Sequence, residues 1–187
     1  KPLPHTAVRV NDDGELEFRG PQVFSGYLNQ PEATAEVLSE DGWFSTGDMG
    51  ELDEDGFIRI FGRKKEIIVT AGGKNVSPAL LEDRIRSHKL ISQCLVVGEG
   101  KPFVAALVTI NTEEWDGSLT DPALIEAVQE VIDDANNQVS RAEAIRKFVI
   151  MPEDWTEANG YLTPSFKLRR QAVLQDLHDT IEALYVR

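Results

Sequence analysis

The sequence contains little cysteine, little basic charge and no long apolar run. Its single cysteine cannot form an internal disulfide framework, which fits a reducing compartment. Lysine and arginine total 19 against 32 acidic residues, and the net charge of −13 argues against nucleic acid or an anionic membrane as the main partner. No window approaches the roughly 20 apolar residues that span a bilayer. A local basic site for a phosphate is still compatible with this charge balance.

The chain also lacks an initiating Met and a leader segment. It opens with Lys1-Pro2-Leu3-Pro4, so we expect a piece of a longer polypeptide, cut by design or by proteolysis. Apolar residues nevertheless make up 41% of the chain, which is enough for a folded core. Cys94 begins an apolar run, so we interpret it as a buried structural thiol rather than as a nucleophile.

Residues 6 to 62 have the pattern of short strands joined by tight turns. The turns at 11–14 and 53–56 contain Gly, Asn and Asp, which tolerate positive φ angles. A piece this small leaves strand edges unpaired, so it is poorly suited to stand alone. The expected elements are strands at 6–10, 15–19, 43–46, 50–53 and 57–61 and a short helix at 31–38.

After the charged run at 62–66 the pattern becomes a mixture of helices and strands. The helix predicted from Asp121 places Leu124, Val128 and Ile132 on one face, which is the spacing of a helix packed on a core. We therefore predict an α+β domain from about residue 66. Its expected elements are strands at 67–70, 92–98, 103–110 and 147–150 and helices from 77, from 121, at 140–143 and at 167–185.

Two segments of the first part carry candidate binding groups. Asp48 follows a Thr-Gly turn, where its carboxylate could accept two hydrogen bonds from a vicinal diol such as a ribose or could satisfy its own backbone. The cations Arg63, Lys64 and Lys65 at the domain junction suit either an anionic ligand or a solvated linker.

Two segments of the second part raise similar alternatives. Gly72 and Gly73 would let a ligand approach the backbone, or they form only a tight connection. Lys167 is predicted at the start of the last helix, where the helix dipole disfavours a cation. A cation in that place weakly indicates a function, and a solvated lysine is the alternative. None of the four segments is specific when taken alone.

The order of these segments along the chain resembles the adenylate-forming superfamily, which includes acyl-CoA ligases, luciferases and peptide-synthetase adenylation domains. The resemblance covers essentially the whole chain. Residues 71–78 and 163–168 look most like the long-chain fatty-acid–CoA ligase branch. The segments that carry the resemblance are 14–20, 26–28 with 31–34, 41–48, 62–68 and 163–169.

This resemblance implies an architecture. Residues 66–187 would form the C-terminal lid domain, with a small antiparallel or mixed sheet and helices. Residues 1–62 would be a mostly β remnant of the large AMP-binding domain, and residues 63–66 would be the hinge. The family's Ser/Thr/Gly-rich phosphate loop and Tyr-Gly-x-Thr-Glu segment do not occur in the sequence, so the chain alone is expected to be inactive.

The resemblance also implies a reaction. Such enzymes are acid–thiol ligases that join a carboxylate to AMP and then move the acyl group to the thiol of CoA. The expected substrates are a fatty acid, ATP and CoA, with Mg²⁺ as activator and none of them bound tightly to this chain. We expect no nucleic-acid partner, no resident metal site and a cytoplasmic location. Peripheral membrane contact stays open.

Roles follow residue by residue from the same resemblance. Asp48 matches the carboxylate that holds the ribose hydroxyls, and Arg63 matches the arginine that reaches the ribose or phosphate. Lys65 matches the hinge position. Lys167 matches the lysine that bridges the acyl carboxylate and the α-phosphate during adenylation.

The glycine loop completes the implied site, because Gly72, Gly73 and Lys74 match the loop that lines the pantetheine tunnel. Two departures from the family pattern matter. Phe166 stands where the common pattern has Gly, a variant that fits the long-chain branch, and Val69 replaces a lysine of luciferase-like members. Two alternatives stay open: a fatty-acyl–AMP ligase that feeds a carrier protein, and a non-catalytic binding domain derived from the lid.

Overall fold

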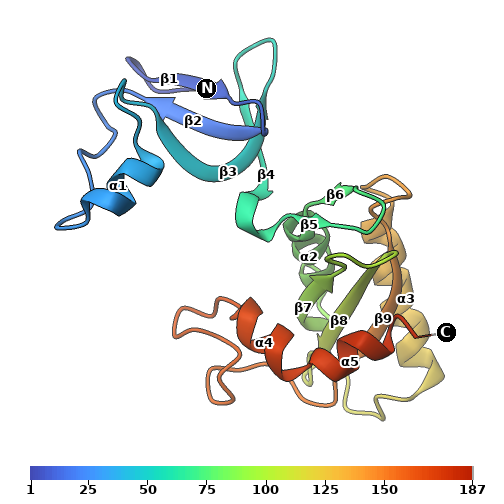
Figure 1. Cartoon of the computed structure of the whole chain (residues 1–187). Coiled ribbons are helices and arrows are strands. Elements are labelled where there is room, and N and C mark those ends of the chain that lie inside the picture. Colours follow the sequence, from blue (N-terminus) through green and yellow to red (C-terminus); the bar gives the residue numbers. More distant parts are fainter. Residues whose placement is uncertain (187) are drawn as a thin grey trace. The chain divides into compact units, whose positions relative to one another are not determined.

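The computed structural model describes residues 1–186, and its backbone divides into two compact units. Unit 1 is Lys1–Ile67 and unit 2 is Ile68–Arg187. Figure 1 shows that unit 1 is built around one curved sheet, whereas unit 2 combines strands and helices. No helix within the described residues is long and apolar enough to cross a bilayer.

Unit 1 is an antiparallel sheet in the order β1-β2-β3-β4. The first turn forms as its composition predicts: the Asn11 side chain accepts hydrogen bonds from the amides of Asp13 and Glu15 (both 3.0 Å), and Gly14 has φ +84°. The elements are β1 (Ala7–Val10), β2 (Glu15–Arg19), α1 (Pro31–Val37), β3 (Phe44–Leu52), β4 (Ile58–Arg63) and the 3₁₀ turn η1 (Lys64–Glu66).

The strands predicted at 43–46 and 50–53 are in fact one strand, β3. Glycine bends this strand without ending it, because Gly47 takes φ +73° and the register shifts between Met49 and Gly50. Gly50 is also required by close packing. A Cβ there would lie 2.5 Å from the Arg59 carbonyl oxygen.

Unit 2 contains a small hairpin and a three-stranded sheet. The larger sheet has the order β7-β8-β9, with β8 antiparallel to β7 and parallel to β9, so the expected mixed sheet is present. The elements are β5 (Ile68–Val69), β6 (Asn75–Val76), α2 (Pro78–Arg86), β7 (Ile91–Val97), β8 (Val104–Ile110), α3 (Pro122–Asn136), β9 (Ile145–Ile150), α4 (Arg170–Asp176) and α5 (His178–Ala183).

Both faces of this sheet are covered, which gives unit 2 three layers (Figure 1). Successive side chains of a strand point to opposite faces, so Val96 packs toward α2 and α3 while Leu95 packs toward α4 and α5. Every residue of the central strand β8 is buried for the same reason. Cys94 is 1% exposed and burial raises its pKa well above the usual range, so the interpretation as a buried structural thiol is confirmed.

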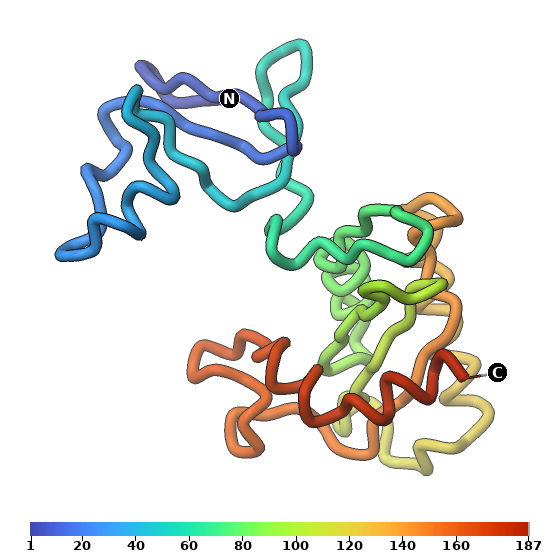
Figure 2. Tube along the Cα trace, in the orientation of Figure 1, coloured from blue at the N-terminus to red at the C-terminus, as the bar shows by residue number. Residues whose placement is uncertain are grey.

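The final helix predicted at 167–185 is wrong in two respects. It is two short helices, α4 and α5, separated at Leu177, whose φ and ψ of −103° and 20° are not helical. It also begins later than predicted, because Leu162 and Leu168 form an antiparallel bridge that holds residues before Arg170 in a turn. Figure 2 traces the long irregular segment 151–169, coloured orange to red, that precedes α4.

The short helix predicted at 140–143 is a single turn. Its capping contact does form, since the Ser140 amide donates to the Glu143 carboxylate at 2.9 Å and the Ala144 amide donates to the Ser140 carbonyl. The chain then enters β9 at Ile145, which leaves no length for a helix.

Candidate functional site

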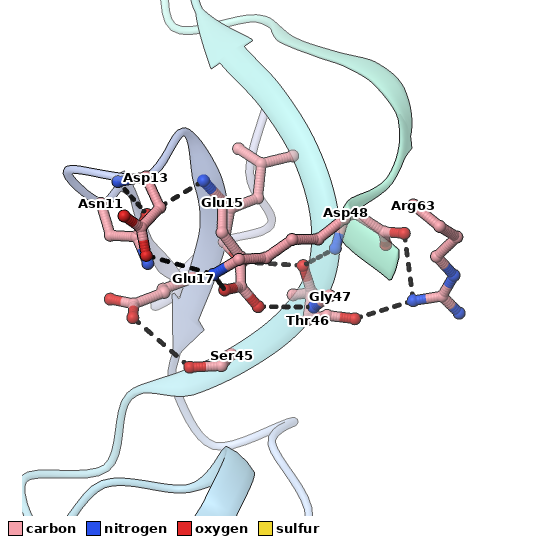
Figure 3. Close-up of polar contacts among 11 residues, drawn as sticks. Asn11, Asp13, Glu15, Glu17, Ser45, Thr46, Gly47, Asp48 and Arg63 are labelled. Atoms are coloured by element: carbon pink, nitrogen blue, oxygen red, sulfur yellow. Dashed lines mark hydrogen bonds and ion pairs between the residues drawn. The ribbon is translucent and has the colours of Figure 1, made fainter. Parts of the chain in front are cut away.

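The first candidate group lies where β3 and β4 pair. Asp48 and Arg63 are direct partners in the register, and Arg63 Nη1 is 3.1 Å from Asp48 Oδ1 (Figure 3). Arg63 also donates to the Thr46 carbonyl at 2.8 Å. The side chains of Asp48 and Arg63 are 31% and 59% exposed, so a ligand can reach both. Within residues 1–186, Arg63 is the only charged partner of Asp48.

The turn before Asp48 fixes its backbone. Thr46 Oγ1 donates to the Leu16 carbonyl (2.7 Å) and accepts a hydrogen bond from the Asp48 amide (3.0 Å). The Gly47 amide donates to Glu15 Oε1 at 2.7 Å. The Asp48 backbone is therefore held by Thr46, and its carboxylate is directed at Arg63 instead of completing its own turn (Figure 3).

A second ion cluster, which sequence reasoning missed, supports the first. Lys64 Nζ lies 3.0 Å from Glu15 Oε2 and 3.2 Å from Asp13 Oδ2. The hydrogen bonds to Glu15 and then to Asp13 raise the pKa of Lys64. Lys64 and Arg63 are therefore both paired within unit 1, and both remain exposed, as does Lys65. The alternating carboxylates at 13, 15 and 17 were the signal that could have revealed this cluster.

An open groove of about 880 Å³ adjoins both clusters within unit 1. Its apolar lining residues suit a planar ring, and its cations Arg63 and Lys65 suit an anion or a set of hydroxyls. The residues that line it are Glu15, Tyr27, Glu36, Val37, Phe44, Ser45, Thr46, Gly47, Arg63, Lys64, Lys65 and Glu66.

The glycine loop of unit 2 connects β5 to β6. It closes through hydrogen bonds from the Gly73 amide to the Thr70 carbonyl (2.8 Å) and from the Thr70 amide to the Lys74 carbonyl (3.0 Å). Gly73 has φ +75°, yet a Cβ placed on it would meet no atom within 4 Å. The loop therefore presents open backbone, and Lys74 beside it pairs with Glu143 at 3.6 Å.

Lys167 lies in a tight hairpin and not at a helix start, so the expectation of a cation opposed to a helix dipole is wrong. The Thr163 amide donates to the Lys167 carbonyl (2.8 Å), and the Lys167 amide donates to Thr163 Oγ1 (3.0 Å). Phe166, with φ +59°, forms the bend. Among the described residues, none forms an ion pair or hydrogen bond with the Lys167 ammonium group, which leaves it free to contact a ligand.

The structure thus divides the expected residues between the units. Asp48 and Arg63 meet in unit 1, with Lys65 on the adjoining groove. The glycine loop and Lys167 belong to unit 2. In the part of the chain that the structure describes, no three His, Cys, Asp or Glu side chains gather in a way that could hold a metal ion.

Comparison with known sequences gives a consistent result. Residues 65–187 match the family described as AMP-binding enzyme C-terminal domain. The chain is 51% identical over 200 aligned positions to the long-chain-fatty-acid–CoA ligase FadD15 of Mycobacterium tuberculosis, covering 99% of this chain and 33% of that protein. It is 36% identical to the long-chain-fatty-acid–CoA ligase ACSBG2 of Gallus gallus, covering 92% and 27%. The chain spans about a third of the length of the curated relatives it matches.

Solved structures of similar fold include adenylation domains of carboxylic acid reductases. The chain superposes on that of a carboxylate reductase from Mycobacterium chelonae with a TM-score of 0.82 and 25% identity, covering 98% of this chain and 31% of that one. A carboxylic acid reductase domain from Segniliparus rugosus, solved with AMP and a co-purified carboxylic acid, gives a TM-score of 0.75 and 28% identity over 92% and 28%.

Proposed function

The chain belongs to the AMP-binding enzyme family, and on that premise we propose that it is the C-terminal part of an ATP-dependent long-chain fatty-acid–CoA ligase. The named relatives support the substrate class, since those cited above are long-chain-fatty-acid–CoA ligases. By itself the chain is proposed to be inactive, because the family's phosphate loop does not occur in it. We further propose a cytoplasmic enzyme with no nucleic-acid partner, whose membrane contact is at most peripheral.

The reaction has two half-reactions. A carboxylate oxygen of the fatty acid attacks the α-phosphorus of ATP, forming acyl-AMP and releasing pyrophosphate. The sulfur of CoA then attacks the acyl carbon, and AMP leaves. Mg²⁺ would accompany ATP as an activator, and none of these molecules is proposed to bind tightly to this chain alone.

The Asp48–Arg63 pair beside the unit 1 groove is the observation that carries the nucleotide part of this proposal. Asp48 would accept hydrogen bonds from the ribose hydroxyls, since an ionised carboxylate is an acceptor with several lone pairs. Arg63 would donate to the ribose or the phosphate, and its contact with Asp48 at 3.1 Å supports a shared role for the two side chains. A solved domain of similar fold contains AMP, which supports nucleotide binding as the activity of this part of the chain.

Lys167 would act in the first half-reaction. Attack of a carboxylate on a phosphate brings two anions together, and an ammonium group that contacts both offsets their repulsion and orients them. The free ammonium of Lys167 on a closed hairpin supports this role. A substrate can contact this ammonium group without displacing a partner within the described residues.

Residues 63–66 would form the hinge between the half-reactions, with rotation at Lys65. The contacts of Lys64 with Asp13 and Glu15 would fix the preceding residue to unit 1. Lys65→Pro is then expected to slow CoA transfer while leaving adenylation in place, as rapid-quench measurement of each half-reaction would show. Unchanged CoA transfer would remove Lys65 from the hinge.

Gly72, Gly73 and Lys74 would line the tunnel for the pantetheine arm of CoA. The open space around both glycines supports this role, because a Cβ on Gly73 meets nothing and one on Gly72 approaches only Thr70 Oγ1 at 3.9 Å. A side chain at Gly72 would thus leave the fold intact and obstruct only a ligand.

A hybrid enzyme tests the whole proposal. Residues 1–187 replace the matching third of the Mycobacterium tuberculosis ligase, and two activities are measured with a long-chain fatty acid: exchange of pyrophosphate into ATP and formation of acyl-CoA. We expect both activities, with Asp48→Ala raising the KM for ATP and the exposed control Asp55→Ala leaving it unchanged. A folded hybrid without fatty-acid-dependent exchange would overturn the proposal, and exchange without acyl-CoA would favour an acyl-AMP ligase.

A further inference from the structure

The hairpin that carries Lys167, residues 160–169, is closed by its own contacts. The Arg169 amide donates to the Tyr161 carbonyl at 2.8 Å, and Arg169 Nη1 donates to the Gly160 carbonyl at 3.0 Å. Together with the Leu162–Leu168 bridge, these bonds set the shape of the hairpin. They do not attach it to the rest of unit 2.

Tyr161 and Leu168 pack on the apolar cluster of unit 2, and Arg170, the residue directly after the hairpin, adds a polar attachment. Its Nη2 donates to both carboxylate oxygens of Glu82 on α2, at 2.5 and 2.7 Å. Its Nη1 donates to the Val96 carbonyl on β7 at 3.1 Å. Glu82 Oε1 in turn accepts the Val96 amide at 2.7 Å. One residue of β7 is thus held through both of its polar backbone groups.

Glu82 and Arg170 bond to the Val96 backbone because of the position of Val96 in the sheet. β7 is an edge strand, and Val96 faces Ala106 of β8 with its own amide and carbonyl directed away from that strand. Buried backbone groups need partners, and Glu82 and Arg170 supply them. The side chains of Glu82 and Arg170 are 9% and 18% exposed, so the contact is largely shielded from water.

The segment before the hairpin has a separate anchor on the same sheet. Thr109 Oγ1 donates to Asp154 Oδ1 at 2.5 Å, and Ser92 Oγ donates to Asp154 Oδ2 at 2.7 Å. Ser92 lies on β7, as Val96 does. The irregular segment that contains Lys167 is therefore held at both ends by side chains attached to one sheet, and Arg170 is the attachment nearer to Lys167.

The stability of unit 2 is a poor explanation for this buried ion pair. Burial raises the pKa of the Glu82 carboxyl, and the Arg170 guanidinium and the Val96 amide oppose that rise. A buried pair of this kind typically contributes no more to stability than apolar side chains of similar volume, although it fixes one arrangement of the elements that it joins. What the pair fixes here is the position of the Lys167 hairpin on the sheet.

We propose that Arg170 and Glu82 are positioning residues for adenylation, which clamp the Lys167 hairpin to Val96 so that the Lys167 ammonium is held where the carboxylate and α-phosphate meet. This inference rests on the proposed role of Lys167. Neither residue touches the substrates. A small displacement of Lys167 is enough to slow the first half-reaction, because a misplacement of about 1 Å can cost about 10²-fold in rate.

The hybrid enzyme described above separates positioning from stability. Arg170→Met and Glu82→Gln are expected to lower pyrophosphate exchange by about 10- to 100-fold and to leave CoA transfer from preformed acyl-AMP within about twofold. The matched control is Arg84→Met, also on α2, which removes the exposed ion pair with Asp134 and leaves the hairpin untouched. Equal loss in both half-reactions would overturn the proposal.

The double variant Glu82→Met/Arg170→Met covers the case in which the single variants unfold. It leaves no buried charge unpaired, so its Tm is expected to exceed that of Arg170→Met. Adenylation is expected to stay low in spite of this recovery. Recovery of adenylation together with Tm would show that the pair only stabilises unit 2 and would overturn the proposal.

Amide hydrogen exchange on the 187-residue chain tests the clamp without any activity. The Lys167 and Arg169 amides are expected to exchange at least tenfold faster in Arg170→Met than in the wild-type chain, and unchanged in Arg84→Met. Unchanged exchange in Arg170→Met would overturn the proposal that Arg170 holds the hairpin, even if the hybrid is an active ligase. Faster exchange in a chain whose hybrid lacks all activity would instead uphold the clamp and reject the proposed function.

Discussion

The two units of this chain are stabilised in different ways. In unit 1, Leu16 is the only buried apolar side chain among the described residues, and its neighbours Glu15 and Glu17 are buried carboxylates. Both Arg9 and Arg19 stack over the Trp43 ring, with their Cζ atoms 4.2 and 4.9 Å from its centroid. Unit 2 instead covers both faces of its sheet with apolar clusters.

The difference indicates where each unit is sensitive. A unit held by charged contacts responds to charge changes and salt, because exposed ion pairs are screened. A unit held by close packing responds to lost volume. The candidate ligand-binding side chains also differ between the units. Asp48 and Arg63 of unit 1 are paired with one another, whereas the Lys167 ammonium of unit 2 has no partner among the described residues.

The largest effect is expected where an unpaired group meets substrate. In the hybrid ligase, Lys167→Ala should lower pyrophosphate exchange by about 10²- to 10³-fold, by analogy with loss of an oxyanion-hole donor. Transfer from preformed acyl-AMP should persist, and Tm should not change because the side chain has no partner among the described residues. Lys89→Ala, another exposed lysine, serves as control. Equal loss of both half-reactions would contradict the role.

The packed unit is tested by removing volume. Leu107→Ala in β8, a fully buried position, should destabilise unit 2 by about 2–5 kcal/mol. Alkylation of Cys94 reports this unfolding, because the thiol is buried and the chain has no other cysteine. The Trp43 indole signal should report no change in unit 1.

Leu80→Ala, half-exposed on α2, is the matched control and should shift stability by less than about 0.5 kcal/mol. If the Cys94 and Trp43 signals shift together in Leu107→Ala, the two units unfold as one and are not stabilised separately.

The charged unit is tested by removing one carboxylate. Glu15→Ala takes away the acceptor of the Gly47 amide and the main partner of Lys64, so it should destabilise unit 1 by about 1–3 kcal/mol. Urea titration of the Trp43 indole signal measures this, with exposed Glu54→Ala as control. Cys94 should stay protected, and a loss of that protection would show that unit 2 depends on this cluster.

The smallest effect is expected at a charge contact of unit 2. Lys101 Nζ lies 2.6 Å from Glu182 Oε1, and this hydrogen bond lowers the pKa of the Glu182 carboxyl. A lowered pKa means that the contact stabilises above the unfolded pKa and is lost as pH falls through the folded one. Glu182→Gln should therefore lower Tm slightly at neutral pH.

The two melting curves should converge in acid, below the pKa of folded Glu182, because both side chains are then uncharged. Exposed Glu130→Gln on α3 should match the wild type at every pH. A difference between Glu182→Gln and the wild type that persists in acid would show that the effect is not electrostatic.

Local chemistry made much of the fold predictable. The turn at 11–14 and the strands beside it follow from Gly and Asn at positions that need them, and the periodic helix from Asp121 follows from its apolar spacing. The continuity of β3 and the break at Leu177 were missed, because a bulge and a helix end depend on contacts with other elements.

The candidate site was less predictable. Asp48 and Arg63 were selected separately, and only the register of β3 with β4 shows that they pair. The attachment of the Lys167 hairpin to the sheet could not be foreseen, since it depends on Arg170 meeting Glu82, 88 positions away in the sequence. The roles of Lys65, Lys167 and the glycine loop come from the family resemblance and stay predictions.

The contacts of Val96 also bear on how this chain behaves at high concentration. An edge strand with unpaired backbone groups is a template on which a second chain can add a strand. Glu82 and Arg170 occupy one such position of β7 with charged side chains, which a foreign strand cannot easily displace. Mutation of Arg170 would leave the Val96 carbonyl without its side-chain donor and available to a strand of another chain. Glu82 and Arg170 are therefore expected to disfavour aggregation as well.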